Sequence, residues 1–192
     1  MRPLVLAAML LTSFSAQACD LSLVAPAKSA LKKPVQVKAS LADGIMTTSY
    51  SVTAPSLNAT KVFGPGQYPY TFDVVELFVT FSETGYPYFE FEVSPYNQNY
   101  QVRILTHAQH QEGVDLGLVS TATIRPASGW DAELKIPLKP LGWDGDPKKI
   151  RGNFYSILGR GLTRSYWSTF LPRAKHADFH HPQFFETLLR CG

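Results

Sequence analysis

Glutamates in strand-like segments are the first candidates for chemistry. Glu90 and Glu92 are two residues apart in the segment 86–94, so their side chains share one face of the expected strand. Glycoside hydrolysis needs two carboxylates opposed across a cleft, whereas these two lie side by side. The sequence also has no Gly-x-Ser-x-Gly motif, phosphate-binding loop or nucleotide fingerprint. We therefore predict that this protein is not an enzyme.

Histidines and aspartates could bind metal ions. The segment 176–181 carries three histidines and one aspartate, but no helix is expected there to give the spacing of a metal site, and no cysteine assists. Asp144 and Asp146 lie in an Asp-Gly-Asp turn and are candidate calcium ligands, because calcium prefers oxygen. The alternative for this pair is an ordinary turn. Apart from this calcium candidate, we expect no cofactor.

The N-terminus has the pattern of a secretory signal peptide. Arg2 is followed by an apolar run at residues 4–11, and Ala16 and Ala18 are small residues at the positions that precede a cleavage site. The run is shorter than the roughly 20 residues that span a bilayer. We predict a signal peptide at residues 1–18, a single domain at residues 19–192, and a periplasmic or secreted location.

The chain has two cysteines, Cys19 directly after the expected cleavage site and Cys191 next to the C-terminus. An even number of cysteines in an exported protein favours a disulfide bond, which here would join the two chain ends. The alternative is a lipid anchor on Cys19 with a free Cys191. Both alternatives remain open from the sequence.

Short strands dominate the expected secondary structure. Alternating or β-branched segments are separated by turn clusters rich in glycine, proline and asparagine, and no segment shows sustained helical periodicity beyond one turn at residues 138–141. This pattern predicts an all-β fold, an antiparallel two-sheet β-sandwich or a barrel. The expected strands are residues 34–41, 48–53, 73–81, 86–94, 100–106, 116–124, 130–138, 153–158 and 184–189.

Alternation within residues 73–81 predicts which face of that strand is buried. Val75, Leu77, Val79 and Phe81 share one wholly apolar face, which we expect to point into the core. Glu76 then lies on the opposite, ligand-facing side of the sheet. The basic residues form no dense tract, so no nucleic-acid partner is predicted.

Four blocks of sequence resemble family 9 carbohydrate-binding modules and the wider DOMON-like sandwich domains. The first, residues 72–95, is similar to the family's Asp-x-Val-Glu-x-Phe strand and the hairpin that follows. The second, residues 129–142, is similar to its Trp-x-x-Glu-x-x-Ile-Pro strand and turn. Residues 150–158 and the tail at 166–185, with Phe-His-His-Pro, complete the series in the family's order.

The resemblance implies a two-sheet β-sandwich that binds a mono- or oligosaccharide without catalysis. Matching the motifs position by position implies the aromatic rings Tyr70 and Phe179, the acceptor Glu76 and the donor Arg103, with His180 beside them. Sugar-binding members have tryptophan at both ring positions, where this chain has tyrosine and phenylalanine.

These residue types suit a sugar. A flat ring covers the apolar C–H face of a sugar, and charged groups form paired hydrogen bonds with its hydroxyls. Two other classes stay open. Some DOMON-like domains hold haem between methionine and histidine, for which Met46 is the remaining methionine after cleavage. A protein-interaction sandwich without a small ligand is the other class.

Overall fold

The computed structural model describes residues 17–22, 34–170 and 179–189. Within these ranges the chain forms two antiparallel β-sheets, and the only helices are single turns of 3-10 helix. This arrangement confirms the all-β sandwich. None of the described helices is long and apolar enough to cross a membrane. The 3-10 turns are η1 (Pro69–Thr71), η2 (Lys139–Leu141), η3 (Pro147–Lys149), η4 (Gly161–Thr163) and η5 (Pro182–Phe184).

The smaller sheet has five strands in the order β1-β2-β3-β9-β8. Its side chains alternate between buried and exposed along β2 and β3, so one face packs on the core and the other faces solvent. The strands are β1 (Gln17–Ser22), β2 (Val35–Ala42), β3 (Ile45–Thr53), β8 (Val119–Arg125) and β9 (Gly129–Pro137).

The larger sheet has seven strands in the order β11-β10-β4-β5-β6-β7, and β12 also pairs with β10. Every residue of β4 and β5 is buried, so these two strands are covered on both faces. The strands are β4 (Val74–Thr80), β5 (Tyr88–Val93), β6 (Asn99–Thr106), β7 (Gln109–Glu112), β10 (Arg151–Leu158), β11 (Ser165–Ser168) and β12 (Glu186–Thr187).

The two faces of the larger sheet belong to two separate apolar clusters. Val75, Leu77 and Val79 pack in the main core between the sheets, as their alternation predicts. Val74 and Phe78 point the other way and pack in a smaller cluster on the outer face. Glu76 lies between them in sequence and therefore shares that outer face.

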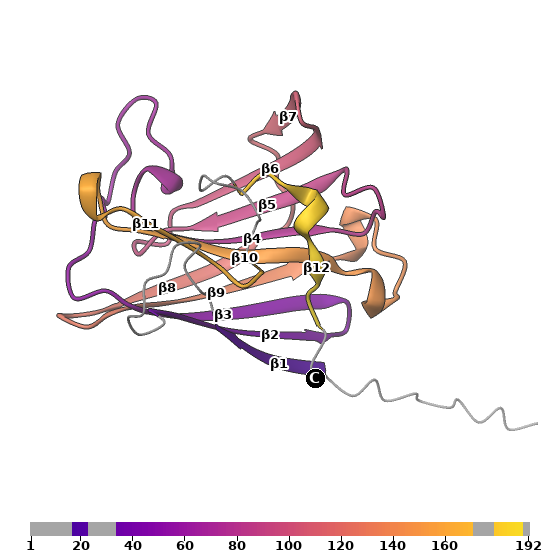
Figure 1. Ribbon diagram of the computed structural model, residues 1–192, viewed down its shortest axis with the longest axis horizontal. Coiled ribbons are helices and arrows are strands. Elements are labelled where there is room, and N and C mark those ends of the chain that lie inside the picture. The colour runs from indigo at the N-terminus through magenta and orange to yellow at the C-terminus, as the bar shows by residue number, and fades with distance from the viewer. Residues whose placement is uncertain (1–16, 23–33, 171–178, 190–192) are drawn as a thin grey trace, which may run out of the picture.

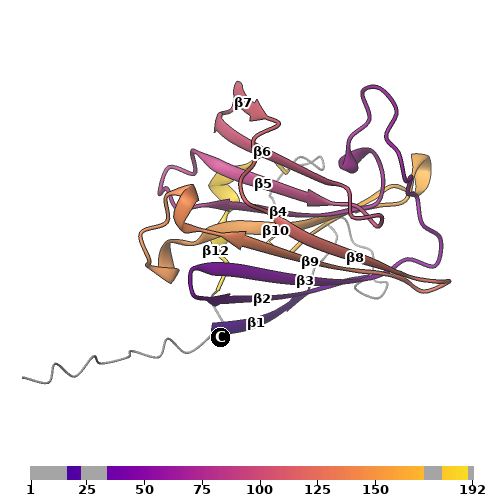
Figure 2. The same cartoon turned by 180° about the vertical axis from the view of Figure 1, so that it is seen from behind.

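Residues 179–189, which we call the C-terminal segment, cover part of this outer face. This segment crosses in front of β10 and β4 in Figure 1 and behind them in Figure 2, where the smaller sheet with β8 and β9 is nearer the viewer. Phe179 and Phe185 from this segment join the outer cluster. The outer face is thus partly covered by this segment, and the uncovered part can form a pocket.

Most expected strands are present, and the differences lie at the edges and the ends of the chain. The polar segment 109–112 forms strand β7, and residues 165–168 form β11; neither was expected as a strand. The expected strand at 184–189 is reduced to β12, and its first residue belongs to η5. β1 begins at Gln17, so two of its residues lie before the expected cleavage point.

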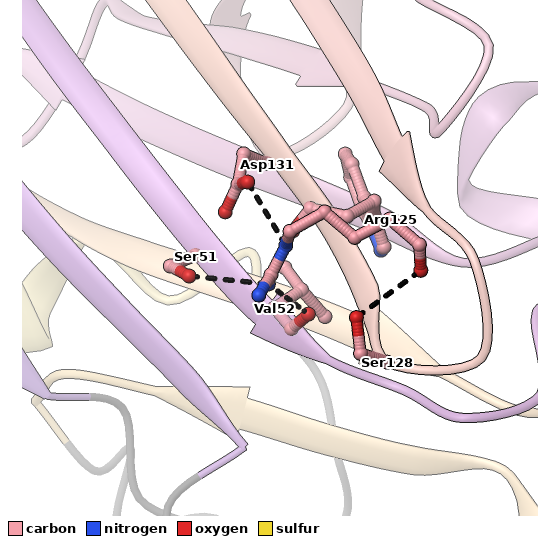
Figure 3. Close-up of polar contacts among 6 residues, drawn as sticks. Ser51, Val52, Arg125, Ser128 and Asp131 are labelled. Atoms are coloured by element: carbon pink, nitrogen blue, oxygen red, sulfur yellow. Dashed lines mark hydrogen bonds and ion pairs between the residues drawn. The ribbon is translucent and has the colours of Figure 1, made fainter.

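Arg125 connects three strands on the exposed face of the smaller sheet (Figure 3). Its Nη2 atom donates to the Val52 carbonyl oxygen at 2.9 Å and to Ser51 Oγ at 3.2 Å. Its Nε atom forms an ion pair with Asp131 at 2.9 Å. Both charged side chains are well exposed, so the ion pair itself contributes at most about 1 kcal/mol.

Asp73, directly before β4, holds together two connections that flank the open part of the outer face. This fully buried carboxylate accepts a hydrogen bond from the Asn58 amide at 3.0 Å and one from the Gly159 amide at 2.7 Å. The Asn58 side chain in turn donates to the Gly159 carbonyl oxygen at 3.0 Å. The loop before β4 is therefore fixed to the β10–β11 turn.

Asp73→Ala is expected to lower the free energy of unfolding by about 1–3 kcal/mol, because it leaves two partly buried backbone amides, those of Asn58 and Gly159, without their acceptor. Urea denaturation measures this change. Asp115→Ala is the control, since Asp115 is exposed and accepts one hydrogen bond, from the Gly117 amide of its own turn. Similar small losses in both variants would contradict the proposed anchoring role of Asp73.

Candidate functional site

The open part of the outer face is a pocket of about 370 Å³, which we call the outer-face pocket. Its size falls within the range of small-molecule sites. The strands β4, β5, β6 and β7 form its floor, and η1, β10, β11 and the C-terminal segment form its sides. Its lining residues are Tyr70, Glu76, Phe78, Glu90, Glu92, Tyr100, Val102, His110, Glu112, Ile157, Tyr166, Phe179 and His180.

Strand register places the polar floor residues in rows. Glu76 of β4 is directly opposite Glu92 of β5, which is opposite Tyr100 of β6. In an antiparallel sheet, opposite residues point to the same face, so these side chains converge. The next row runs through Phe78, Glu90, Val102 and Glu112 and adds two further carboxylates.

Two of these glutamates are buried and incompletely hydrogen-bonded. Glu76 is 2% exposed and Glu92 is 1% exposed. Glu92 Oε2 accepts a hydrogen bond from the Tyr70 amide at 3.0 Å. The Oε1 atom of each glutamate has no hydrogen-bond partner among the residues that the structure describes. Each glutamate therefore has one carboxyl oxygen whose hydrogen bonding is incomplete.

The protonation of these side chains is shifted by their surroundings. Burial raises the pKa of both Glu76 and Glu92 well above its ordinary value of 4.5, and the negative charge of neighbouring glutamates raises each pKa further. Burial, followed by the charge of Glu112, also raises the pKa of the Tyr100 hydroxyl. The floor of the pocket therefore resists holding all of its negative charges at once.

Tyr70 lies at the mouth of the pocket, as a half-exposed ring. It stacks on Tyr68 with ring centroids 5.2 Å apart and meets Tyr100 edge-on at 6.2 Å. Its backbone is fixed from both sides, because its amide donates to Glu92 and its carbonyl oxygen accepts from Arg164 Nη2. The exposed ring is thus held on a rigid support.

Phe179 and His180 come from the C-terminal segment and form the opposite side of the pocket. Phe179 is 6% exposed, and its ring stacks on Tyr155 at 4.0 Å. His180 Nδ1 is 2.7 Å from the Tyr88 hydroxyl oxygen, and the His180 ring lies 5.3 Å from that of Phe78. Phe179 is consequently more a buried wall than a projecting platform.

The structure brings together Tyr70, Glu76, Phe179 and His180, but it does not bring Arg103 to them. Val102 and Ile104 point to the outer face, so Arg103 between them points to the opposite face. There its guanidinium lies 5.9 Å from the ring centroid of Phe89, a residue of the main core. The prediction that Arg103 is the donor beside Glu76 in the site is therefore wrong.

Several lining residues were missed by sequence reasoning. His110 and Glu112 belong to β7, whose four residues are all exposed, so the segment lacks the apolar alternation of a strand. Tyr100 and Tyr166 were not distinguished from other strand tyrosines. Alternation in residues 100–106 places Tyr100 and Val102 on one face, and this signal could have identified Tyr100.

The other expected sites lie away from the pocket. In the turn before η3, Asp144 forms an ion pair with Lys149, and Asp146 caps the Lys148 amide, as ordinary turn carboxylates do. No group of three or more candidate metal ligands occurs among residues 17–22, 34–170 and 179–189. Calcium binding stays a prediction.

The remaining expectations concern buried or undescribed residues. Met46, the methionine considered for haem, is fully buried in the main core. Cys19 lies in β1, and Cys191 lies outside the described residues, so the disulfide and its lipid-anchor alternative stay predictions. Of the histidine cluster, His176 also lies outside the described residues.

No family model matches the chain, and no curated protein matches it. Solved structures do match over most of its length. A protein from Bacteroides uniformis, described as a candidate carbohydrate-binding protein, aligns with a TM-score of 0.70 and 20% identity over 88% of this chain and 84% of its own.

Two structures of a family 9 carbohydrate-binding module from Caldicellulosiruptor kristjanssonii also match. The complex with cellotriose gives a TM-score of 0.58 at 16% identity, covering 86% of this chain and 80% of the module. The complex with glucose gives 0.54 at 14% identity, covering 88% and 81%. The chain therefore has the β-sandwich fold of family 9 carbohydrate-binding modules.

Proposed function

We propose that this chain is a non-catalytic carbohydrate-binding protein and that the outer-face pocket is its sugar site. The observation that carries the proposal is a pocket with carboxylates across its floor and aromatic rings on its sides. The fold likeness adds support, because similar structures are complexes with cellotriose and glucose.

The floor and the mouth of the pocket each have a chemical role in this proposal. The exposed Tyr70 ring covers an apolar sugar face, while Glu76 and Glu92 bind hydroxyl groups below it. The free Oε1 atoms accept hydrogen bonds from sugar hydroxyls when ionised. Each charge-assisted hydrogen bond of this type contributes about 1.5–3 kcal/mol.

The same arrangement argues against glycoside hydrolysis. Hydrolysis needs a carboxylic acid and a second carboxylate on opposite sides of the scissile bond. Glu76, Glu90 and Glu92 instead occupy adjacent positions on one face of neighbouring strands. They are suited to holding one side of a ligand, so we propose binding without turnover.

Export is part of the proposal. We propose that residues 1–18 are removed and that the sandwich acts in the periplasm or outside the cell, where polysaccharides occur. Cys19 would then be the first residue of the mature chain and lie at the start of the ordered strand β1.

Tyr70→Ala is expected to weaken sugar binding about 2- to 12-fold, because a stacking contact is worth roughly 0.5–1.5 kcal/mol. A glycan array first identifies a bound sugar, and isothermal titration calorimetry then measures its affinity. Tyr96→Ala is a matched control, because Tyr96 is 40% exposed against 39% for Tyr70 but does not line the pocket. Equal effects of the two substitutions would contradict the site, and no binding to any glycan would contradict the function.

The buried glutamates predict a pH dependence of stability in the ligand-free protein. The pKa of each glutamate is higher in the folded state than in the unfolded state. Between its unfolded-state pKa and its folded-state pKa, each group therefore binds more protons in the folded protein. The contribution of these two groups to the free energy of unfolding should therefore fall as the pH rises above 4.5, the ordinary pKa of a glutamate.

Glu92→Gln is expected to remove part of this decrease, because an amide cannot ionise. Urea denaturation across the pH range measures the slope, and Glu83→Gln, at an exposed glutamate outside the pocket, should leave it unchanged. If the free energy of unfolding of Glu92→Gln falls with pH as steeply as that of the wild type, the ionisation of Glu92 does not destabilise the folded protein.

The state of the N-terminus is checked by intact mass. Protein from the periplasm is expected to begin at Cys19 and to gain mass on reduction and alkylation of a Cys19–Cys191 disulfide. A lipid on Cys19 would instead add the mass of acyl chains and carry the protein into the detergent phase. A full-length mass in the exported fraction would contradict cleavage.

A further inference from the structure

The outer-face pocket carries an excess of negative groups. Glu76, Glu90, Glu92 and Glu112 line it, and no lysine or arginine does so among the described residues. The basic side chains that line it, among the described residues, are the imidazoles of His110 and His180. The pocket therefore sets four carboxyl groups against two imidazoles. A ligand that brings positive charge would favour the ionised form of these carboxyl groups.

The two deepest carboxylates show a specific need for donors. Both residues are at least 98% buried, and their Oε1 atoms have no hydrogen-bond partner within the described part of the chain. A buried acceptor without a donor is costly, and an ionised one more so. The two residues are directly opposite in the sheet register, so one small donor group can reach both.

The nearby arginines already have other partners. Arg164, whose charge acts on Glu76, donates to the carbonyl oxygens of Tyr70 and Thr71 and to the Tyr166 hydroxyl. Arg103 lies on the other face of the sheet. The carboxylate pair is therefore not neutralised by a direct ion pair with either side chain.

Aromatic rings around the carboxylates also suit a cation. Phe78, Tyr100 and Tyr166 line the same pocket, and the face of an aromatic ring attracts positive charge. A metal ion is a weaker candidate, because the described residues contain no group of three or more ligands placed to hold one. An organic ammonium group needs only hydrogen-bond acceptors and rings, both of which are present.

We propose that the ligand of the outer-face pocket is an amino sugar whose ammonium group binds between Glu76 and Glu92. This inference rests on the proposed carbohydrate-binding function and narrows its ligand class from sugars to positively charged sugars. The ammonium group donates hydrogen bonds to the two free Oε1 atoms, and the sugar ring lies against Tyr70.

Three related monosaccharides test the proposal on the wild-type protein. Calorimetric titrations with glucosamine, N-acetylglucosamine and glucose at about pH 6.5, where an amine of this type is protonated, compare one ring with and without the charge. Glucosamine is expected to bind at least about tenfold more tightly than the other two, because its hydrogen bonds are charge-assisted at both ends. Raising the salt concentration should weaken glucosamine binding more than glucose binding.

Isosteric substitutions locate the charge effect. Glu76→Gln and Glu92→Gln should each reduce the preference for glucosamine over glucose, while Glu83→Gln should keep it. Circular dichroism melting curves establish that each variant is folded. If a glutamine variant does not fold, the comparison of the three sugars on the wild type still decides the proposal.

The outcomes separate this inference from the function on which it rests. Equal affinity for glucose, N-acetylglucosamine and glucosamine would overturn the amino-sugar inference and leave carbohydrate binding intact. Failure of all three sugars, together with chitosan and cellulose oligosaccharides, would overturn both. Calcium chloride that binds alone and displaces glucosamine would also overturn the inference, in favour of a metal site.

Discussion

The burial of two neighbouring carboxylates, Glu76 and Glu92, is the constraint on which the site depends. Antiparallel pairing of β4 and β5 puts them side by side on one face of the sheet, and burial makes their negative charge costly. The protein relieves this cost only in part, through the Tyr70 amide on Glu92. A structure that retains such a pair without completing its hydrogen bonds has a deep site that a polar ligand can complete.

The larger sheet can carry this site because both of its faces are apolar around it. Its inner face contributes to the main core, and its outer face holds a second cluster that includes Phe78, Tyr155 and Phe185. The second cluster packs beside the pocket and helps to bury β4 and β5. The carboxylates therefore lie in a region of low dielectric constant, where their interactions with a charged partner are stronger than in water.

Much of the fold could be predicted from the sequence, because strand periodicity is a local signal. Alternation in residues 73–81 correctly placed Val75, Leu77 and Val79 in the core and Glu76 on the other face. The predicted place of Arg103 in the site was wrong because it came from a motif match. Val102 and Ile104 face the outer cluster, so strand alternation puts the Arg103 side chain on the opposite face of the sheet. Site residues from η1, β4 and the C-terminal segment meet through tertiary structure, which no local pattern specifies.

The edge strand β7 shows the limit of such patterns most clearly. Its residues are exposed and polar, so they resemble a loop, yet backbone pairing with β6 brings Glu112 opposite Val102 and His110 opposite Ile104. Pairing rather than side-chain burial thus determines where these two groups lie. Their contribution becomes visible only when the register of the whole sheet is known.

This placement of β7 has an evolutionary consequence. Its side chains border the outer-face pocket but contribute little to the apolar interior. Substitutions there should therefore change the free energy of unfolding only slightly. One edge of the outer-face pocket can therefore diversify while the carboxylate floor and the sandwich stay unchanged. Related chains could change the shape and charge of this pocket through β7 alone, without changes in the strands beneath it.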